Sequence, residues 1–260
     1  MNCQEDYLVR VKNISKTFKP PVGHKPRPSL KQISFDVQRS TIFGIIGETG
    51  SGKTTIAKTI MRLIAPDCGE VWFNGVELTT LSRSRLKSLR PTFQMIYQNP
   101  ISALNPAQSV RTIISNPLRL TSNYSRKEAF LEVDRLLEAV QLEPKIASYY
   151  PHELSGGQAQ RIDIVRALTL KPKLLIADEP VSSIDASIRG QILNLILKMK
   201  KNQDFTLIFI SHDLDLVKRL CDEVIILQNG EIVEKGSVNS IFNNPHHPYT
   251  QDLIGLMGRK

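Results

Sequence analysis

Five short runs of apolar residues recur along the chain and indicate its fold. They cover residues 41–46, 93–97, 174–177, 206–210 and 224–227. Most of these runs are apolar without alternation, which is typical of parallel strands that are covered by helices on both faces. Helical patterns lie between them, for example over residues 186–200 and 214–220. Strands that alternate with helices predict an α/β fold with a mostly parallel core sheet.

The N-terminal part of the chain has a different pattern. Residues 7–11 and 33–37 alternate between apolar and polar positions, as half-buried strands do. Residues 70–78 contain the pair Asn74-Gly75 between two apolar stretches, which is the strongest short-range signal for a β-hairpin. We therefore expect an N-terminal antiparallel β subdomain. A second hairpin is expected at residues 228–231, which also contain Asn-Gly.

Strand signals disappear between residues 105 and 154. The apolar positions of residues 126–140 fall on one face of a helix, namely Ala129, Val133, Leu136, Leu137 and Val140. We expect a helical subdomain, roughly residues 99–160, inserted into a single domain that spans residues 1–260. The tail, residues 243–260, contains Pro245 and Pro248 before a short predicted helix at residues 249–257.

Composition narrows the class of protein. The 34 Lys and Arg residues against 25 Asp and Glu give a net charge of +9, but the basic residues are dispersed and the densest cluster, residues 83–90, also fits a solvated helix face. A specific nucleic-acid role is therefore not expected. No apolar run approaches the length of about 18 residues that a membrane span needs, and the polar N-terminus does not resemble a secretory signal. We expect a cytoplasmic protein whose three cysteines are reduced thiols.

The stretch from Gly47 to Thr54 fits the pattern G-x-x-x-x-G-K-[ST] between a predicted strand and a predicted helix. Glycines allow such a loop to curl so that its backbone N–H groups point into one concavity, and the helix that follows adds its positive dipole end. Lys53 is expected to reach the β- and γ-phosphates of a nucleoside triphosphate, and the Thr54 hydroxyl to ligate Mg²⁺. The residues expected to bind the nucleotide here are Gly47, Glu48, Thr49, Gly50, Ser51, Gly52, Lys53, Thr54 and Thr55.

Two adjacent carboxylates, Asp178 and Glu179, end the apolar run at residues 174–177. At the carboxyl edge of a parallel sheet they would face the bound phosphates. Asp178 is expected to hold Mg²⁺, directly or through water, and Glu179 to act as the general base toward the attacking water. The structural alternative is a polar strand end that only starts a loop.

A second phosphate-binding device precedes them at Ser155-Gly156-Gly157-Gln158, which opens a predicted helix. One triphosphate does not need two such devices, unless the second device serves the nucleotide of a neighbouring subunit. A capped helix start is the alternative interpretation.

With these motifs in this order, the chain resembles the nucleotide-binding subunits of ATP-binding cassette (ABC) transporters. The resemblance implies that Phe18 stacks on adenine, that Gln98 contacts Mg²⁺ and the γ-phosphate, and that His212 lies near the γ-phosphate. It identifies residues 154–158 as the signature motif and Asp185 as part of the D-loop. It also implies that two cassettes meet head to tail, so that Ser155, Gly156, Gly157, Gln158 and Asp185 act in trans on the partner's ATP.

A narrower resemblance concerns the transported solute. The ATPases of dipeptide, oligopeptide and nickel importers have segments similar to residues 95–106, 150–153 and 244–250 of this chain. It implies a second ATPase subunit in a homodimer or heterodimer, two integral membrane permeases, an extracytoplasmic solute-binding protein, and a position on the cytoplasmic face of the membrane. Nickel or another small solute, export, and an ABC ATPase acting on nucleic acid remain alternatives.

Three departures from that group's pattern are visible. The sequence stops at Lys260 without the Cys-containing tail of many peptide-importer ATPases, which leaves the peptide subgroup open and argues against an iron–sulfur cluster. Val181 stands where Thr is usual and Ala159 where Arg is usual. Neither change removes a catalytic group.

Overall fold

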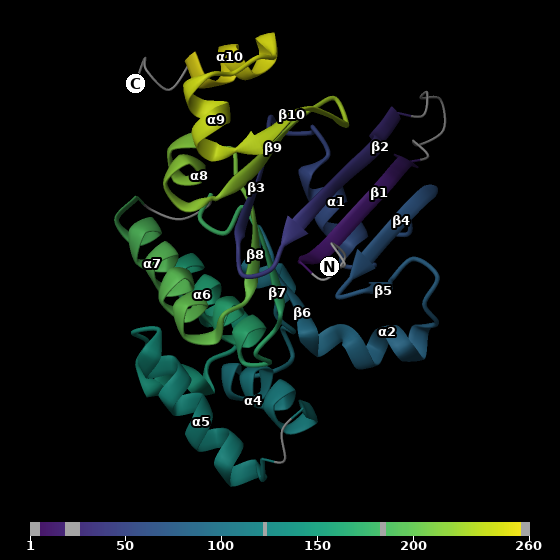
Figure 1. The fold of residues 1–260 in the computed structure, drawn as a ribbon. Coiled ribbons are helices and arrows are strands. Elements are labelled where there is room, and N and C mark those ends of the chain that lie inside the picture. Colours follow the sequence, from purple (N-terminus) through teal and green to yellow (C-terminus); the bar gives the residue numbers. More distant parts are fainter. Residues whose placement is uncertain (1–5, 19–26, 122–123, 183–185, 256–260) are drawn as a thin grey trace, which may run out of the picture. The chain divides into compact units, whose positions relative to one another are not determined.

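A computed structural model describes residues 6–18, 27–121, 124–182 and 186–255. It divides into two compact units, which are described separately. Unit 1 comprises Met1–Leu89 and Thr206–Lys260, and unit 2 comprises Arg90–Phe205. Figure 1 labels their helices and strands.

Unit 1 contains the expected antiparallel sheet. Its strands are β1 (Tyr7–Phe18), β2 (Arg27–Gln38), β4 (Cys68–Phe73) and β5 (Val76–Glu77), in the order β2-β1-β4-β5. The predicted hairpin joins β4 to β5, and both of its turn residues have positive φ, 50° at Asn74 and 79° at Gly75. Turns of this kind match the right-handed twist of the flanking strands, so the hairpin prediction is confirmed.

The other strands of unit 1 position residues 47–54, which are called the nucleotide loop below. β3 (Ile42–Gly47) lies between β8 (Thr206–Ile210) and β9 (Glu223–Gln228) and is parallel to both. β10 (Glu231–Ser237) pairs antiparallel with β9. Every residue of β3 and β8 is buried, which explains their continuous apolar runs. The helices of this unit are α1 (Lys53–Ile60), α2 (Arg83–Leu89), α8 (Leu214–Leu220), α9 (Val238–Asn243) and α10 (Pro248–Gly255).

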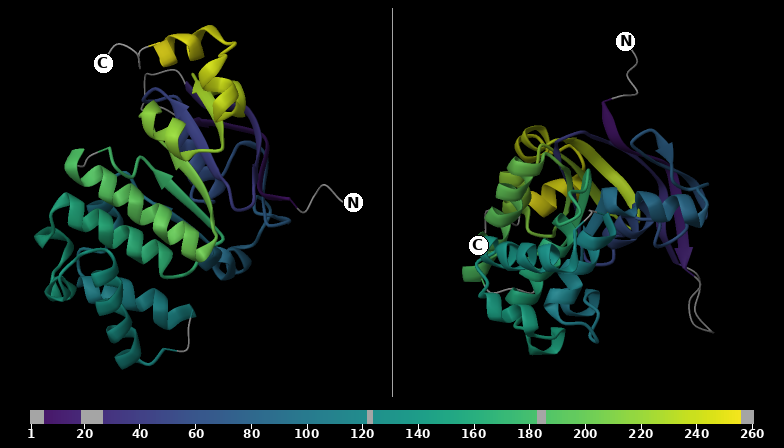
Figure 2. Two further views of the ribbon diagram at one scale, coloured as in Figure 1. Left: turned by 60° about the vertical axis from the view of Figure 1, so that its left-hand side comes forward. Right: turned by 90° about the horizontal axis from the view of Figure 1, so that it is seen from below.

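Unit 2 is mainly helical, and its described residues include two parallel strands. These are β6 (Phe93–Ile96) and β7 (Leu174–Asp178), with Ile96 opposite Ala177. The helices are α3 (Pro100–Ala103), α4 (Val110–Thr121), α5 (Arg126–Ala139), α6 (Gly156–Leu168) and α7 (Ala186–Gln203), and α6 packs beside α7 (Figure 2). Short 3-10 helices cover Arg90–Thr92, Pro144–Ser148 and Pro151–Glu153.

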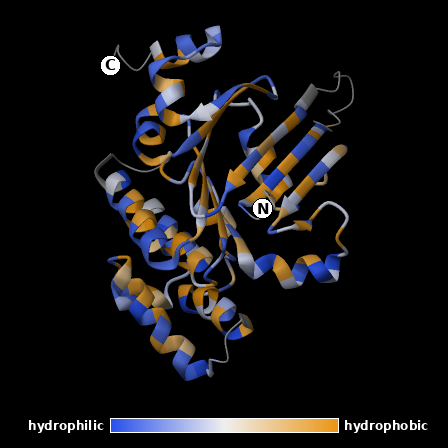
Figure 3. Ribbon diagram, in the orientation of Figure 1, coloured by the Kyte–Doolittle hydropathy of each residue, from blue (hydrophilic) through white to orange (hydrophobic). Residues whose placement is uncertain are grey.

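Helices α4, α5 and α6 share one apolar core. The contributing residues include Val110, Ile114, Ala129, Val133, Leu137 and Ile162, all buried. Figure 3 shows the corresponding alternation of hydrophobic and hydrophilic colour along α5. An ion pair from Arg111 Nη2 to Asp134 Oδ1, 2.9 Å long, also joins α4 to α5. The stripe predicted on α5 is therefore the face that this helix buries.

The extents of several elements differ from the prediction. β1 continues to Phe18 and β2 begins at Arg27, whereas strand alternation was predicted only over residues 7–11 and 33–37. Helix α7 continues to Gln203, three residues beyond the predicted end, and β6 ends at Ile96 rather than at residue 97. Helix α10 starts one residue before the predicted start, at Pro248. Of the basic cluster at residues 83–90, residues 83–89 form α2, which buries none of its side chains, as a solvated face requires, and Arg90 begins a short 3-10 helix. Within the described residues, no helix combines the length and apolar composition of a membrane span.

Helix α5 offers a test of local stabilisation. Ser125 Oγ accepts a hydrogen bond from Glu128 N, and Glu128 Oε2 accepts one from Ser125 N, at 3.3 and 2.8 Å. This capping box satisfies two backbone donors at the helix start. We expect Ser125→Ala to lower the free energy of unfolding by about 1 kcal/mol, measured by urea denaturation. An unchanged denaturation midpoint would contradict this role of the cap.

Candidate functional site

The loop between β3 and α1 has a backbone that only glycine can supply. Gly50 and Gly52 have φ angles of 85° and 111°, in the left-handed region. A Cβ atom at Gly52 would lie 2.6 Å from Ser29 O, and one at Gly47 would lie 2.4 Å from Leu227 O. Real side chains do not approach backbone atoms so closely, so the glycines of the motif are fixed by close packing as well as by backbone conformation.

Lys53 is buried and lies against its own loop. Its Nζ donates to Gly47 O at 2.7 Å and to Glu48 O at 2.9 Å. The hydroxyl of Ser51 is also buried, and it has no hydrogen-bond partner among the described residues. An unpaired buried hydroxyl is costly unless a ligand completes it. The loop therefore has a polar atom that a bound anion would satisfy.

The start of α1 also favours a bound anion. Gly52 is the N-cap and provides no side-chain cap, and the first turn contains no acidic residue. The first N–H groups of a helix and its positive dipole end attract phosphate. Thr54 and Thr55 lie half-buried in this first turn, and Thr55 Oγ1 is 2.9 Å from Ser29 Oγ. These features fit a triphosphate at the loop, with the Thr54 hydroxyl available for a divalent cation.

His212 lies at the same edge of the sheet as this loop. β3 and β8 are parallel neighbours, and Ile45 is opposite Ile210. His212 follows two residues after Ile210 and is exposed. Asp213 caps α8, accepting from Leu216 N at 3.2 Å, and this cap fixes where the chain turns after the strand. The parallel order thus brings two separate sequence motifs of unit 1 to one edge.

Phe18 ends β1 and exposes 44% of its surface. The Nζ of Lys16 lies 5.8 Å from the centre of its ring. The ring is therefore accessible to a flat ligand, and it is not a core aromatic.

Unit 2 brings Gln98 and Glu179 into contact. Gln98 Nε2 donates to Glu179 Oε2 at 3.2 Å. The two residues follow the parallel strands β6 and β7, whose carboxyl ends meet at one edge. Asp178, the last residue of β7, is only 2% exposed. Glu179 has φ of 48°, in the left-handed region, which is uncommon for a non-glycine residue.

The start of α6 is a capping box. Ser155 Oγ accepts from Gln158 N at 3.3 Å, and Gln158 Oε1 accepts from Ser155 N at 2.9 Å. Ser155 and Gly156 are exposed, and a Cβ atom at Gly156 would meet nothing within 4 Å. Because the Ser155 oxygen acts as an acceptor here, its hydroxyl proton remains to be donated to a ligand. Gly157 lies half-buried in the first turn, and Asp185 lies outside the described residues.

Sequence reasoning missed a contact to the nucleotide loop. The hydroxyl of Tyr249, in α10, accepts a hydrogen bond from Glu48 N at 3.3 Å. The preceding residues are anchored by Glu234 of β10, whose carboxylate accepts from His246 N and His247 N at 2.9 and 3.1 Å. Burial raises the pKa of Glu234, but the hydrogen bonds that its carboxylate accepts, above all the one from His246 N, outweigh this effect and leave the pKa lowered. The only sequence signal was the distinctive tail at residues 244–250.

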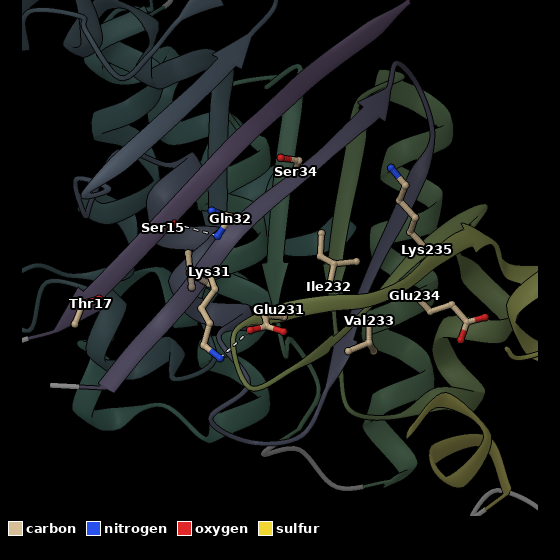
Figure 4. Close-up of a pocket in the computed structure, with 11 residues that line it drawn as sticks. Ser15, Thr17, Lys31, Gln32, Ser34, Glu231, Ile232, Val233, Glu234 and Lys235 are labelled. Atoms are coloured by element: carbon tan, nitrogen blue, oxygen red, sulfur yellow. Dashed lines mark hydrogen bonds and ion pairs between the residues drawn. The ribbon is translucent and has the colours of Figure 1, made fainter. Parts of the chain in front are cut away.

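A wide groove of about 970 Å³ in unit 1 contains none of the candidate residues. It lies between β1, β2 and β10, and Figure 4 shows the side chains that line it, most of which are polar. Lys31 Nζ and Glu231 Oε1 form a 2.8 Å ion pair across it. The size of this groove is therefore not a guide to the chemistry of the chain.

Comparisons with known proteins agree with these motifs. The sequence profile described as "ABC transporter" matches residues 30–182. The chain is 43% identical over 258 residues to the oligopeptide transport ATP-binding protein AppF of Bacillus subtilis (strain 168), covering 97% of this chain and 78% of that protein. It is 42% identical over 255 residues to the glutathione import ATP-binding protein GsiA of Escherichia coli (strain K12), but it spans only 41% of that protein's length and 96% of its own.

Solved structures give the same result. A dimeric post-hydrolysis state of the ATP-binding cassette MJ0796 bound to ADP and Pi has a TM-score of 0.81 at 27% identity, covering 88% of this chain and 98% of that chain. CbiO1 from Clostridium perfringens, part of the ABC transporter complex CbiONQ, has a TM-score of 0.76 at 26% identity, with 98% of both chains covered. The chain therefore belongs to the ABC transporter family, as one of its ATP-binding and ATP-hydrolysing cassettes.

Proposed function

We propose that this chain is the ATPase subunit of a membrane importer for dipeptides or oligopeptides. The proposal that the chain hydrolyses ATP with these residues is supported by the hydrogen bond between Gln98 and Glu179, which follow β6 and β7. The cargo assignment is supported by the similarity to AppF and to GsiA, whose printed names concern oligopeptides and glutathione. Glutathione is itself a small peptide, so the two names point to one chemical class.

In this proposal the residues of the nucleotide loop bind the phosphates of ATP. Lys53 neutralises charge on the β- and γ-phosphates, and backbone N–H groups at the start of α1 contribute further donors. Phe18 stacks on the adenine ring. Thr54, Gln98 and Asp178 would hold Mg²⁺, which supplies charge neutralisation at the phosphate oxygens. Their hydroxyl, amide and carboxylate oxygens are the ligands that this cation prefers.

Glu179 acts as the general base in hydrolysis. It takes a proton from water while the water oxygen forms a bond to the γ-phosphorus, and the bond from that phosphorus to the bridging oxygen breaks. The electron pair leaves with ADP, and phosphate is the second product. Gln98 orients Glu179 and the water, and His212 stabilises charge on the γ-phosphate.

A second cassette completes each reaction site. Ser155, Gly156, Gly157, Gln158 and Asp185 of one chain contact the ATP of the other, so that ATP closes the pair and hydrolysis releases it. Gly156 supports this role, because it is exposed and no packing contact requires a glycine there, and Ser155 beside it is also exposed. The pair would work on the cytoplasmic face of the membrane with two integral permeases and an extracytoplasmic solute-binding protein.

The test is purification of the tagged chain with its membrane partners, followed by reconstitution into vesicles. We expect ATP hydrolysis that increases when dipeptides or oligopeptides and the cognate binding protein are added. Hydrolysis stimulated only by nickel or another solute would overturn the cargo assignment. Full-speed hydrolysis by the isolated chain at high dilution would overturn the shared-site mechanism.

A further inference from the structure

Helix α6 contains a carboxylate that no part of the proposed mechanism uses. Asp163 is 0% exposed, and its neighbours on the helix, Ile162 and Ile164, are equally buried. Burial raises the pKa of Asp163, and the guanidinium of Arg166 and the backbone N–H of Tyr97 oppose that rise. A buried ion pair is seldom more stabilising than well-packed apolar residues of similar volume. The presence of this pair therefore calls for a reason other than stability.

The two carboxylate oxygens of Asp163 have separate partners. Oδ1 accepts from Arg166 Nε at 2.9 Å and from Arg166 Nη2 at 2.7 Å. Oδ2 accepts from the backbone N–H of Tyr97 at 3.1 Å. Arg166 Nη2 also donates to Met95 O at 3.3 Å. The pair thus binds one backbone acceptor and one backbone donor of the same short segment.

That segment is the end of β6. Met95 and Tyr97 flank Ile96, the last residue of the strand, and Gln98 follows directly. Because the Met95 C=O and the Tyr97 N–H are both held in place, the direction in which the chain leaves the sheet is fixed. Gln98 is exposed apart from its bond to Glu179, so its position depends on the backbone that carries it.

We propose that Asp163 and Arg166 are positioning residues, which hold the backbone at Met95 and Tyr97 so that Gln98 reaches Glu179. This inference rests on the proposed roles of Gln98 and Glu179 in hydrolysis. It adds that the orientation of Gln98 is imposed from α6, the helix that also begins with Ser155. Neither Asp163 nor Arg166 contacts the reacting atoms in this proposal.

The first test is Asp163→Asn. The amide has one acceptor oxygen and one donor nitrogen, so it can satisfy either Arg166 or the Tyr97 N–H but not both. We expect kcat for ATP hydrolysis in the reconstituted complex to fall roughly tenfold to a hundredfold, as small displacements of positioning groups do. ATP affinity of the purified chain, which depends on the nucleotide loop, should not change. Asp134→Asn is the matched control, because it weakens another Asp–Arg pair of unit 2 and should leave kcat unaltered.

The decisive measurement is a double-mutant cycle with Gln98→Ala. If Asp163 acts through Gln98, kcat of Asp163→Asn combined with Gln98→Ala should equal that of Gln98→Ala alone. A merely structural role would lower kcat by the same factor in both backgrounds, and that result would overturn the proposal. That result would not change the assignment of Glu179 as the general base, because the Glu179→Gln variant tests that assignment separately.

Arg166→Lys provides a second variant should Asp163→Asn fail to fold. Lysine keeps a positive charge for Asp163 but lacks the planar fork that reaches both Asp163 and Met95 O. We expect the same loss of kcat, again absent in the Gln98→Ala background. Wild-type kcat in a folded Arg166→Lys or Asp163→Asn complex would overturn the proposal.

Discussion

Glu179→Gln is expected to reduce steady-state ATP hydrolysis at least about a hundredfold, because the amide cannot accept the proton of the attacking water. The substitution keeps the shape of the side chain and an oxygen that can accept the bond from Gln98 Nε2, now 3.2 Å long. ATP binding should therefore be retained, and ATP-dependent dimers should accumulate. Phosphate release under saturating ATP measures the first effect, and size-exclusion chromatography with ATP measures the second.

Glu132→Gln is the control for this experiment. Glu132 is a partly exposed carboxylate on α5 that pairs with Arg135 at 3.6 Å, so its substitution should leave turnover unchanged. Unimpaired turnover in Glu179→Gln would exclude Glu179 as the base. Loss of ATP binding in that variant would indicate a disrupted fold at the strand end instead of a chemical effect.

Lys53→Ala should weaken ATP binding by about tenfold to a hundredfold, as removal of one hydrogen bond to a charged group does. Lys53 is 5% exposed and already lies against the carbonyls of Gly47 and Glu48, so no other side chain of α1 can replace it at that place. Equilibrium binding of a fluorescent ATP analogue, with and without competing ATP, measures the change.

Lys58→Ala is the matched control, since Lys58 belongs to the last turn of the same helix. Its removal should not change ATP affinity, and a melting curve for each variant separates lost contacts from lost structure. Equal affinities for the wild type and Lys53→Ala would contradict the assigned role of the loop.

Much of the fold could be predicted because local signals agree with tertiary packing. The Asn-Gly turn at residues 74 and 75 has the two positive φ angles that this pair favours. The uninterrupted apolar runs became β3 and β8, which are buried throughout. Helix α4 was not predicted as a separate element; Pro117 lies inside it, and proline normally ends a helical pattern.

The candidate site could be predicted only where motifs exist. The left-handed backbone of Glu179 has no sequence signal, because glutamate has no preference for that conformation. The bond from Glu48 N to Tyr249 joins residues 201 positions apart. Asp163 is fully buried in α6, although a carboxylate in a helix is usually exposed to solvent. Such contacts depend on how distant segments fold together, and local sequence patterns do not reveal them.

Helix α6 has a practical consequence for protein engineering. Its N-cap Ser155 and the buried Asp163 are eight positions apart, so about two helical turns and 12 Å separate them. Grafting this helix from another cassette would exchange the residues proposed to contact a neighbouring chain together with the proposed anchor of the segment before Gln98. Chimeric transporters should therefore transfer residues 93–98 along with α6, since a mismatched graft would assemble normally yet turn over slowly.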